Sequence, residues 1–166
     1  MVPVHKKRGG GDRSLVTNYR PVSIPSVVCK QMEHVTASYL RQVWDKNDWL
    51  YEGQHGFRTG YSCESQVTTV CQDTADSMGN DAIAIDFSKA FDVVPHDQML
   101  MKTANSGVDS RVVAWVWEFL LGRTQWVRVG GQISVEVRVI SCVLPGSVLG
   151  PLLFLAYVND IWRNIV

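Results

Sequence analysis

The sequence has few of the features that mark secreted, membrane-spanning or zinc-binding proteins. Its four cysteines form no C-x-x-C pair, so a zinc site has little support. The start, MVPVHKKRGGG, has no apolar run after its charges, so no signal peptide is expected. The most apolar stretch, residues 143–158, contains Pro and Gly and is short against the roughly 20 residues that a bilayer requires. We therefore expect an intracellular protein, nuclear or cytoplasmic and not secreted, with free thiols and no membrane partner.

Net charge is also absent, because 16 Lys and Arg residues balance 16 Asp and Glu residues. The charges are nevertheless unevenly distributed. Residues 1–58 hold nine basic and five acidic side chains, a balance of +4, whereas residues 59–166 hold seven and eleven, a balance of −4. This division suits a protein that holds phosphates with its first part and a metal with its second. Ordinary scatter of surface charge explains it equally well.

The length of 166 residues and an apolar content of 46% predict one folded domain of ordinary size. Apolar periodicity, caps and turn residues predict mixed α/β structure. Helices are expected over 26–44, 62–77, 95–105, 109–121 and about 147–162, with a short strand over 82–85 and a hairpin over 127–139 that turns at Gly130 and Gly131.

Three local predictions can be compared with the structure. Ser26 is expected to cap the first helix. In the second helix, Val67, Val70 and Cys71 are expected to face inward, with Gly79 as its end. Near the third helix, Asp92 and His96 flank Pro95 and are expected to satisfy free N–H groups, while His55 is expected to be a packed loop histidine.

Asp86 is the most distinctive acidic residue. It follows the apolar run of residues 82–85, which reads as a buried strand. A carboxylate at a buried strand end is costly unless it is paired or bound to metal. Magnesium prefers such oxygens and takes one or two protein ligands together with substrate phosphates. From this pattern alone, an Asp86 that merely caps the following turn is the stronger interpretation.

The segment around Asp86 favours a metal-binding role over a turn cap. AIDFSKAFDVVPHD, which contains Asp86, closely resembles the first catalytic-aspartate motif of non-LTR retrotransposon reverse transcriptases. Three further segments resemble motifs of the same family in the same order: NYRPVSIPSVVCKQMEH, GQHGFRTGYSCESQ and SVLGPLLFLAYVNDI. The resemblance implies a right-hand polymerase, with residues 1–80 as a fingers-like region and residues 81–166 as a partial palm. It also implies an RNA-directed DNA polymerase that uses Mg²⁺, an RNA template, a DNA primer and dNTPs.

The resemblance assigns roles around the polymerase site. Asp86 would bind catalytic Mg²⁺ through its carboxylate, and the carbonyl of Phe87 would add a ligand. Phe91 matches the aromatic residue that packs under the sugar and excludes a 2′-hydroxyl. Read without the family, Phe91 is a core aromatic. Gly146 and Ser147 match the tight turn that lies against the template and the nascent base pair.

The resemblance also implies phosphate contacts. Arg20 matches the arginine that grips the incoming triphosphate, and Lys6 or Lys7 is similar to a nearby lysine with the same task. Both lysines are equally well explained as part of a solvated basic loop. Arg58 resembles a template-side or phosphate contact.

The sequence departs from the family at two places. Cys142 and Pro145 stand where family members usually have Gly and Gln, and proline offers no side-chain hydrogen bond. The aromatic–Ala–Asp–Asp motif, which supplies the other metal-binding carboxylates, does not occur within the 166 residues, and Asp160 matches a helix residue instead. We therefore expect no polymerase activity from this chain alone. A non-catalytic nucleic-acid-binding remnant is the alternative, and a metal-dependent hydrolase at Asp86 and Asp92 has less support. The sequence predicts no oligomeric state.

Overall fold

The computed structural model describes residues 1–6, 12–78, 85–139 and 141–164, and it shows a mixed arrangement of helices and short strands. This confirms the expected mixture of helix and strand. The helices are α1 (Val27–Lys46), α2 (Cys63–Asp76), α3 (His96–Ala104), α4 (Ser110–Leu120) and α5 (Leu149–Val158), with 3-10 helices η1 (Val16–Asn18) and η2 (Ile161–Asn164). The strands are β1 (Val2–His5), β2 (Tyr19–Val22), β3 (Thr124–Gln125), β4 (Arg128–Val129), β5 (Gln132–Ile133) and β6 (Val137–Arg138).

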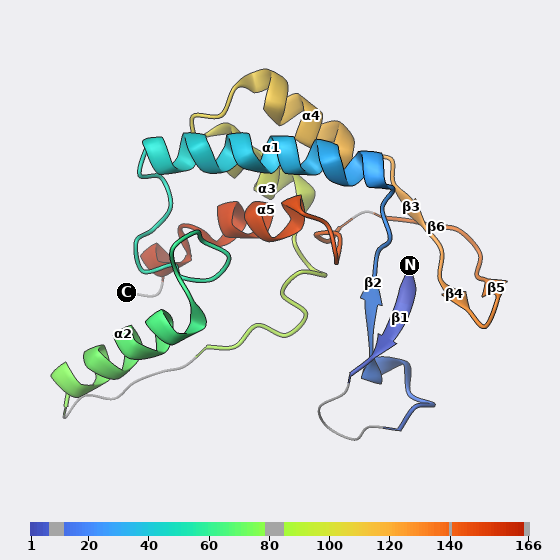
Figure 1. The fold of residues 1–166 in the computed structure, drawn as a ribbon, viewed down its shortest axis with the longest axis horizontal. Coiled ribbons are helices and arrows are strands. Elements are labelled where there is room, and N and C mark those ends of the chain that lie inside the picture. Colours follow the sequence, from blue (N-terminus) through green and yellow to red (C-terminus); the bar gives the residue numbers. More distant parts are fainter. Residues whose placement is uncertain (7–11, 79–84, 140, 165–166) are drawn as a thin grey trace.

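Four helices enclose the core. Helix α1 lies across α5, and α3 contacts both α4 and α5 (Figure 1). The buried apolar side chains come from α1, the loops that follow it, α3, α4, the turn before α5 and α5 itself: Ala37, Leu40, Trp44, Leu50, Val94, Met99, Leu100, Val108, Val116, Phe119, Leu120, Val143, Leu149, Leu152, Leu153, Leu155 and Ala156. Residues before and after position 80 therefore share one hydrophobic core.

Helix α1 begins where its sequence predicts, because the Ser26 hydroxyl accepts a hydrogen bond from the Cys29 amide at 3.2 Å. Its inward stripe is narrower than its apolar pattern suggests. Glu33, Ala37, Leu40 and Trp44 are buried, whereas the valines of its first turn are exposed. The buried positions recur every three or four residues, which is the period of one helix face.

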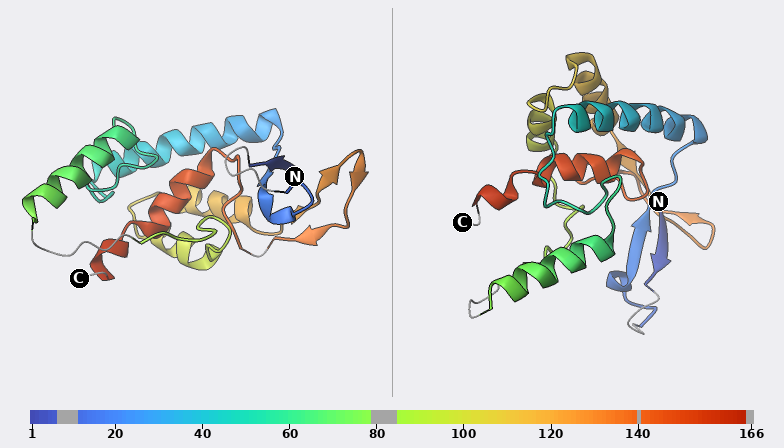
Figure 2. Two further views of the ribbon diagram at one scale, coloured as in Figure 1. Left: turned by 90° about the horizontal axis from the view of Figure 1, so that it is seen from below. Right: turned by 60° about the vertical axis from the view of Figure 1, so that its left-hand side comes forward.

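Helix α2 differs from the prediction in what it buries. Its start is as expected, with a capping box between Ser62 and Ser65. None of its residues is buried, and Val67, Val70 and Cys71, which were expected to face inward, are exposed. The helix lies apart from the four core helices in Figure 1 and in the right-hand view of Figure 2, which agrees with the exposure of its apolar side chains. Its expected end at Gly79 lies outside the described residues.

Helices α3 and α4 occupy the predicted ranges, but α3 lacks the predicted cap. Its N-cap is Pro95, which makes no side-chain hydrogen bond, so the expectation for Asp92 and His96 is wrong. Instead, His96 is buried and its Nε2 lies 2.8 Å from the Cys142 carbonyl oxygen. Helix α4 is capped by the carboxylate of Asp109, which accepts from the Arg111 amide at 2.8 Å.

The hairpin is confirmed. Strands β4 and β5 pair antiparallel around Gly130 and Gly131, which have φ values of +55° and +85°. Two positive φ angles are typical of a tight hairpin turn, and glycine adopts them readily. Strands β3 and β6 continue the ribbon, and a separate hairpin pairs β1 with β2.

The strand expected before Asp86 is not seen where the structure describes it. Residues 82–84 lie outside the described range, while Ile85 is 56% exposed and neither it nor Asp86 belongs to a strand. A strand needs a hydrogen-bonded neighbour, and the described strands pair only as β1–β2, β3–β6 and β4–β5.

Candidate functional site

Three segments that are distant in the sequence line one cavity of about 440 Å³. They are the end of β2, the loop before α3, and the turn that leads into α5. The lining residues are Arg20, Pro21, Val22, Lys89, Ala90, Phe91, Asp92, Leu144, Pro145, Gly146, Gly150 and Pro151. The volume falls in the range of roughly 300–1,000 Å³ typical of small-molecule sites. Three residues singled out in the sequence, Arg20, Phe91 and Gly146, thus meet at one cavity.

Backbone hydrogen bonds hold the three segments together. The amide of Val143 donates to the Phe91 carbonyl at 2.8 Å, which joins the turn to the loop before α3. The amide of Ser23, just after β2, donates to the Pro145 carbonyl at 2.9 Å. The walls of the cavity are therefore fixed by the main chain rather than by side-chain packing alone.

Gly146 has a local structural reason to be glycine. Its φ is +88°, and a Cβ atom there would lie 3.2 Å from the Ser23 carbonyl oxygen. A larger residue would be strained in this conformation and would push against the backbone that follows β2. Gly146 therefore keeps the turn close to that segment and preserves the shape of the cavity.

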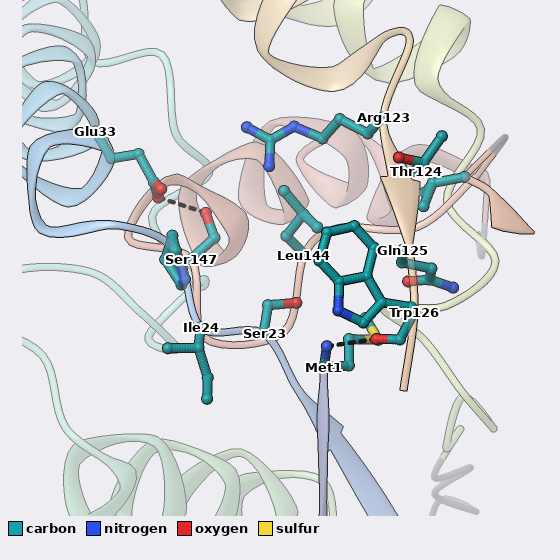
Figure 3. Close-up of a pocket in the computed structure, with 12 residues that line it drawn as sticks. Met1, Ser23, Ile24, Glu33, Arg123, Thr124, Gln125, Trp126, Leu144 and Ser147 are labelled. Carbon is teal, nitrogen blue, oxygen red and sulfur yellow. Dashed lines mark hydrogen bonds between the residues drawn. The ribbon is translucent and has the colours of Figure 1, made fainter. Parts of the chain in front are cut away.

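Glu33 is the buried group that anchors the turn to α1. It is 0% exposed, and its Oε2 accepts hydrogen bonds from the Ser147 hydroxyl at 2.7 Å and from the Val148 amide at 2.7 Å (Figure 3). The Leu149 amide donates to the same oxygen at 3.3 Å. Because Val148 has no capping side chain, the carboxylate from α1 satisfies the free N–H groups at the start of α5 and meets the positive end of that helix.

Ser147 consequently lies away from the cavity lined by Arg20. Its hydroxyl also accepts from the Gly150 amide at 3.0 Å, and the residue is buried. The Ser147 hydroxyl thus makes its contacts within the protein, and the role expected for the backbone of this turn beside a template stays a prediction. The sequence did not predict Glu33 as the partner of Ser147. An indication was present, because Glu33 lies on the same face of α1 as the buried Ala37, Leu40 and Trp44.

Phe91 is held by aromatic contacts. Its ring stacks on Phe154 of α5 with a centroid distance of 4.4 Å and meets Phe57 edge-on at 6.0 Å. Such contacts fix the plane of a half-buried ring while leaving part of it at the cavity. The structure thus allows both interpretations of Phe91, as a core aromatic and as a cavity wall.

The basic residues expected near phosphate do not all line the cavity, although Lys6 lies two residues from Val4, the cross-strand neighbour of Arg20. Arg20 is exposed on β2 and lines the cavity, as does Lys89, which the sequence did not single out. The Lys6 ammonium donates to the Thr17 carbonyl at 2.8 Å, beside η1. Lys7 lies outside the described residues.

Arg58 lines a different cleft of about 550 Å³, together with Tyr51, Tyr61 and Trp162. Its Nη1 donates to the Tyr51 carbonyl at 3.1 Å, and its guanidinium lies 4.7 Å from the centre of the Tyr61 ring. His55 nearby is buried, with Nδ1 2.8 Å from the Ser65 hydroxyl, as expected of a packed histidine. Arg58 and Arg20 therefore serve separate surfaces.

Acidic residues do not gather into a metal cluster in the described parts of the chain. Within those ranges, no group of three or more His, Cys, Asp or Glu side chains could hold a metal ion. Asp86 and Phe87 are exposed and precede the cavity-lining segment that begins at Lys89. Asp160 forms an ion pair with Lys102 of α3, and it lies in the turn after α5 rather than on the helix that the sequence predicted.

Cys142 stands where members of the family that the sequence resembles have glycine, and its backbone conformation is unfavourable for a residue other than glycine. Its φ is +103°, which is unfavourable for a residue with a Cβ atom. Burial, and to a lesser extent the negative charge of Asp92, raises the pKa of its thiol. The thiol is therefore kept neutral beside the cavity, and its backbone carbonyl is fixed by His96.

A second, smaller cavity of about 190 Å³ lies on the other side of the same turn (Figure 3). Glu33 and Ser147 form one wall, and Arg123 and Trp126 form another. Among the atoms described, Ser23 Oγ is buried there without a hydrogen-bond partner. Ordered water is the simplest partner for such an atom, since the wall is polar.

The fold is a mixed helix-and-strand arrangement, and its cavity of about 440 Å³ is lined by basic side chains, an aromatic ring and a glycine turn. The family model for "Reverse transcriptase (RNA-dependent DNA polymerase)" matches residues 4–166. The chain therefore belongs to the reverse transcriptase family, in the non-LTR retrotransposon group indicated by its relatives.

Several retrotransposon proteins are similar to this chain. It is 31% identical over 166 residues to "Probable RNA-directed DNA polymerase from transposon BS" of Drosophila melanogaster, covering 97% of this chain and 18% of that protein. It is 30% identical over 164 residues to "RNA-directed DNA polymerase from mobile element jockey" of the same species, covering 96% and 18%. It is 24% identical over 158 residues to "Retrovirus-related Pol polyprotein from type-1 retrotransposable element R2" of Popillia japonica, covering 91% and 21%. The chain thus spans about a fifth of the length of these relatives.

None of the helices in the described ranges has the length and apolarity needed to cross a membrane.

The contact between Glu33 and α5 predicts a large effect on stability. Glu33→Ala should lower the free energy of unfolding by about 2–4 kcal/mol, because it removes a helix cap and leaves buried donors unsatisfied. Glu33→Gln should cost less, since its side-chain oxygen still accepts. Urea denaturation followed by circular dichroism measures both. Glu118→Ala, at an exposed position of α4, is the matched control, and an equal effect of Glu33→Ala and Glu118→Ala would contradict the assignment.

Proposed function

We propose that this chain forms the nucleotide-binding part of an RNA-directed DNA polymerase of a non-LTR retrotransposon. In this proposal residues 1–80 act as a fingers-like region and residues 81–166 as a partial palm. The observation that carries it is the convergence of Arg20, Phe91 and Gly146, from three separate segments, on one cavity of about 440 Å³. The family supplies the substrate class, which is a dNTP paired to an RNA template beside a DNA primer.

Each wall of the cavity suits one part of a nucleotide. The Arg20 guanidinium can donate two hydrogen bonds to phosphate oxygens. The Phe91 ring, stacked on Phe154, offers a flat apolar surface for the sugar and is the proposed barrier to a 2′-hydroxyl. The Gly146 turn lets backbone approach the bound nucleotide closely, because no side chain intervenes. Ser147 supports this turn through Glu33 rather than through its own contact with substrate.

Magnesium is implied by the family, and the described donors fit it only in part. Asp86 is an exposed carboxylate, and the Phe87 carbonyl is adjacent to it. One carboxylate and one carbonyl can contribute to a single Mg²⁺ site that is completed by water and phosphate oxygens. They do not compensate the charge of two ions. When bound, Mg²⁺ would neutralise the phosphates, and Asp86 and Phe87 would be its protein ligands.

Template contact is proposed for the first part of the chain, which carries the +4 balance of charge. The cleft that contains Arg58 combines a guanidinium with Tyr51, Tyr61 and Trp162. Aromatic rings and arginine are the groups on which unpaired bases stack. Lys6 is a further candidate, because its ammonium donates to Thr17 and has two more N–H groups for a phosphate. This surface also supports the alternative function, a nucleic-acid-binding module without catalysis.

Either function would be exercised inside the cell, in the nucleus or the cytoplasm, where RNA and DNA are found.

The Arg20 assignment is tested by nucleotide binding. Arg20→Ala should weaken the binding of a fluorescently labelled dATP, with Mg²⁺ present, by roughly ten- to hundredfold, because it removes a charge-assisted contact to phosphate. Fluorescence anisotropy of the purified 166-residue chain measures the dissociation constant. Arg58→Ala is the matched control, since Arg58 lines a different cleft, and it should leave that constant unchanged. Equal weakening by both substitutions would argue for non-specific charge attraction.

The incomplete donor set predicts that the 166 residues alone do not extend a primer. Incubation with an RNA template, an annealed DNA primer, dNTPs and Mg²⁺ should yield no template-dependent product on a sequencing gel, because a two-metal mechanism requires carboxylates that the described residues do not provide. Incorporation that is abolished by Asp86→Ala would overturn this expectation.

A further inference from the structure

We propose that Lys89 is the second cation of the nucleotide pocket and binds the triphosphate together with Arg20. This inference rests on the proposed function and adds a residue to it. The family resemblance assigned the accompanying lysine to Lys6 or Lys7, near the start of the chain. The geometry of the described residues points instead to the loop before α3.

The first argument is position. Lys89 and Arg20 come from segments far apart in the sequence, yet both line the cavity of about 440 Å³. Lys89 is exposed, and in the described parts of the chain its ammonium makes no hydrogen bond or ion pair. A lysine that lines a pocket without a protein partner is available to a ligand, and phosphate is a strong acceptor for an ammonium.

The second argument is the contrast with Lys6. The Lys6 ammonium donates to the Thr17 carbonyl at 2.8 Å and closes the loop between β1 and β2. Its backbone amide donates to the Asn18 carbonyl at 2.9 Å. Lys6 lies two residues from Val4, the cross-strand neighbour of Arg20, but it is not among the residues that line the cavity, whereas Lys89 is.

The third argument is backbone conformation. Lys89 has a φ of +54°, in the left-handed region that non-glycine residues rarely adopt. The turn is closed by a hydrogen bond from the Asp92 amide to the Lys89 carbonyl at 2.8 Å. Two residues along the chain from Lys89, the Phe91 carbonyl accepts from Val143, which fixes the loop against the turn before α5. Strain of this kind persists where surrounding contacts hold it, and it often occurs at ligand sites.

The fourth argument is charge. Asp92 lines the same cavity and would repel a triphosphate. Arg20 alone would only offset this one negative charge. With Lys89 the cavity lining has two positive charges against one negative charge, which favours an anionic ligand. Lys89 therefore makes the pocket attractive to phosphate as well as large enough for it.

The experiment compares three probes on the 166-residue chain. Isothermal titration measures the binding of dATP with Mg²⁺, of inorganic tripolyphosphate, and of deoxyadenosine, which lacks phosphate. Lys89→Ala should weaken dATP and tripolyphosphate binding by about tenfold, since one charge-assisted contact is lost, and should leave deoxyadenosine binding unchanged. Lys89→Arg, which keeps the charge, should retain most of the affinity.

Two further variants separate the charge of Lys89 from its effect on folding. Lys89→Gly removes the ammonium but relieves the left-handed backbone, so it should fold at least as well as the parent chain and bind dATP as weakly as Lys89→Ala. Lys6→Ala removes a lysine outside the cavity and should leave dATP binding unchanged. Melting temperatures from circular dichroism check that each variant is folded.

The outcomes distinguish this proposal from the proposed function. If Arg20→Ala weakens dATP binding and Lys89→Ala and Lys89→Gly do not, the pocket is correct and the Lys89 assignment is wrong. If Lys6→Ala weakens binding and the Lys89 variants do not, the second cation is Lys6. If the parent chain binds neither dATP nor tripolyphosphate, the proposed function and the Lys89 assignment both fail.

Discussion

The buried carboxylate of Glu33 is the contact on which the arrangement of the pocket depends. Burying a polar group is expensive unless hydrogen bonds replace its water, and one oxygen of Glu33 accepts three, from Ser147, Val148 and Leu149. These bonds cap α5 and attach its first turn to α1. Because Gly146 immediately precedes this turn, the position of one wall of the pocket is set by a side chain that does not itself line it.

The same turn is held from two other directions, and this explains how distant segments form one site. Val143 bonds to Phe91, which brings the loop before α3 to the turn, and Ser23 bonds to Pro145, which brings the end of β2. The pocket is therefore the space between the turn before α5 and the two segments that are hydrogen-bonded to it. Pro145 departs from the family sequence, but its carbonyl still accepts the hydrogen bond from Ser23, since that contact needs no side chain. What proline removes is the side-chain hydrogen bond that the family's glutamine offers.

The sequence predicted what depends on local chemistry. Ser26 caps its helix, and Gly130 and Gly131 turn the hairpin, because caps and tight turns are decided within a few residues. Arg20, Phe91 and Gly146 were found through the family resemblance, and the structure brings them to one cavity. The exposure of α2 was not predictable. Val67 and Val70 recur at the spacing of an inward helix face, but in the described part of the chain the helix buries none of its residues. Glu33 was missed because its contacts join distant segments, and Lys89 was missed because the cavity that it lines is formed by distant segments. For Glu33 alone the sequence contains an indication, because the residue lies at helical spacing from the other buried residues of α1.

The central claim is that residues 19–23, 86–92 and 144–151 form one nucleotide site. Hydrogen–deuterium exchange of the chain, with and without dATP and Mg²⁺, tests it most directly, since bound ligand protects the backbone amides that it orders. Protection confined to those three segments, with residues 48–62 around Arg58 unchanged, is the predicted result. Protection confined to residues 48–62, or none at a dATP concentration that saturates binding, would contradict the claim.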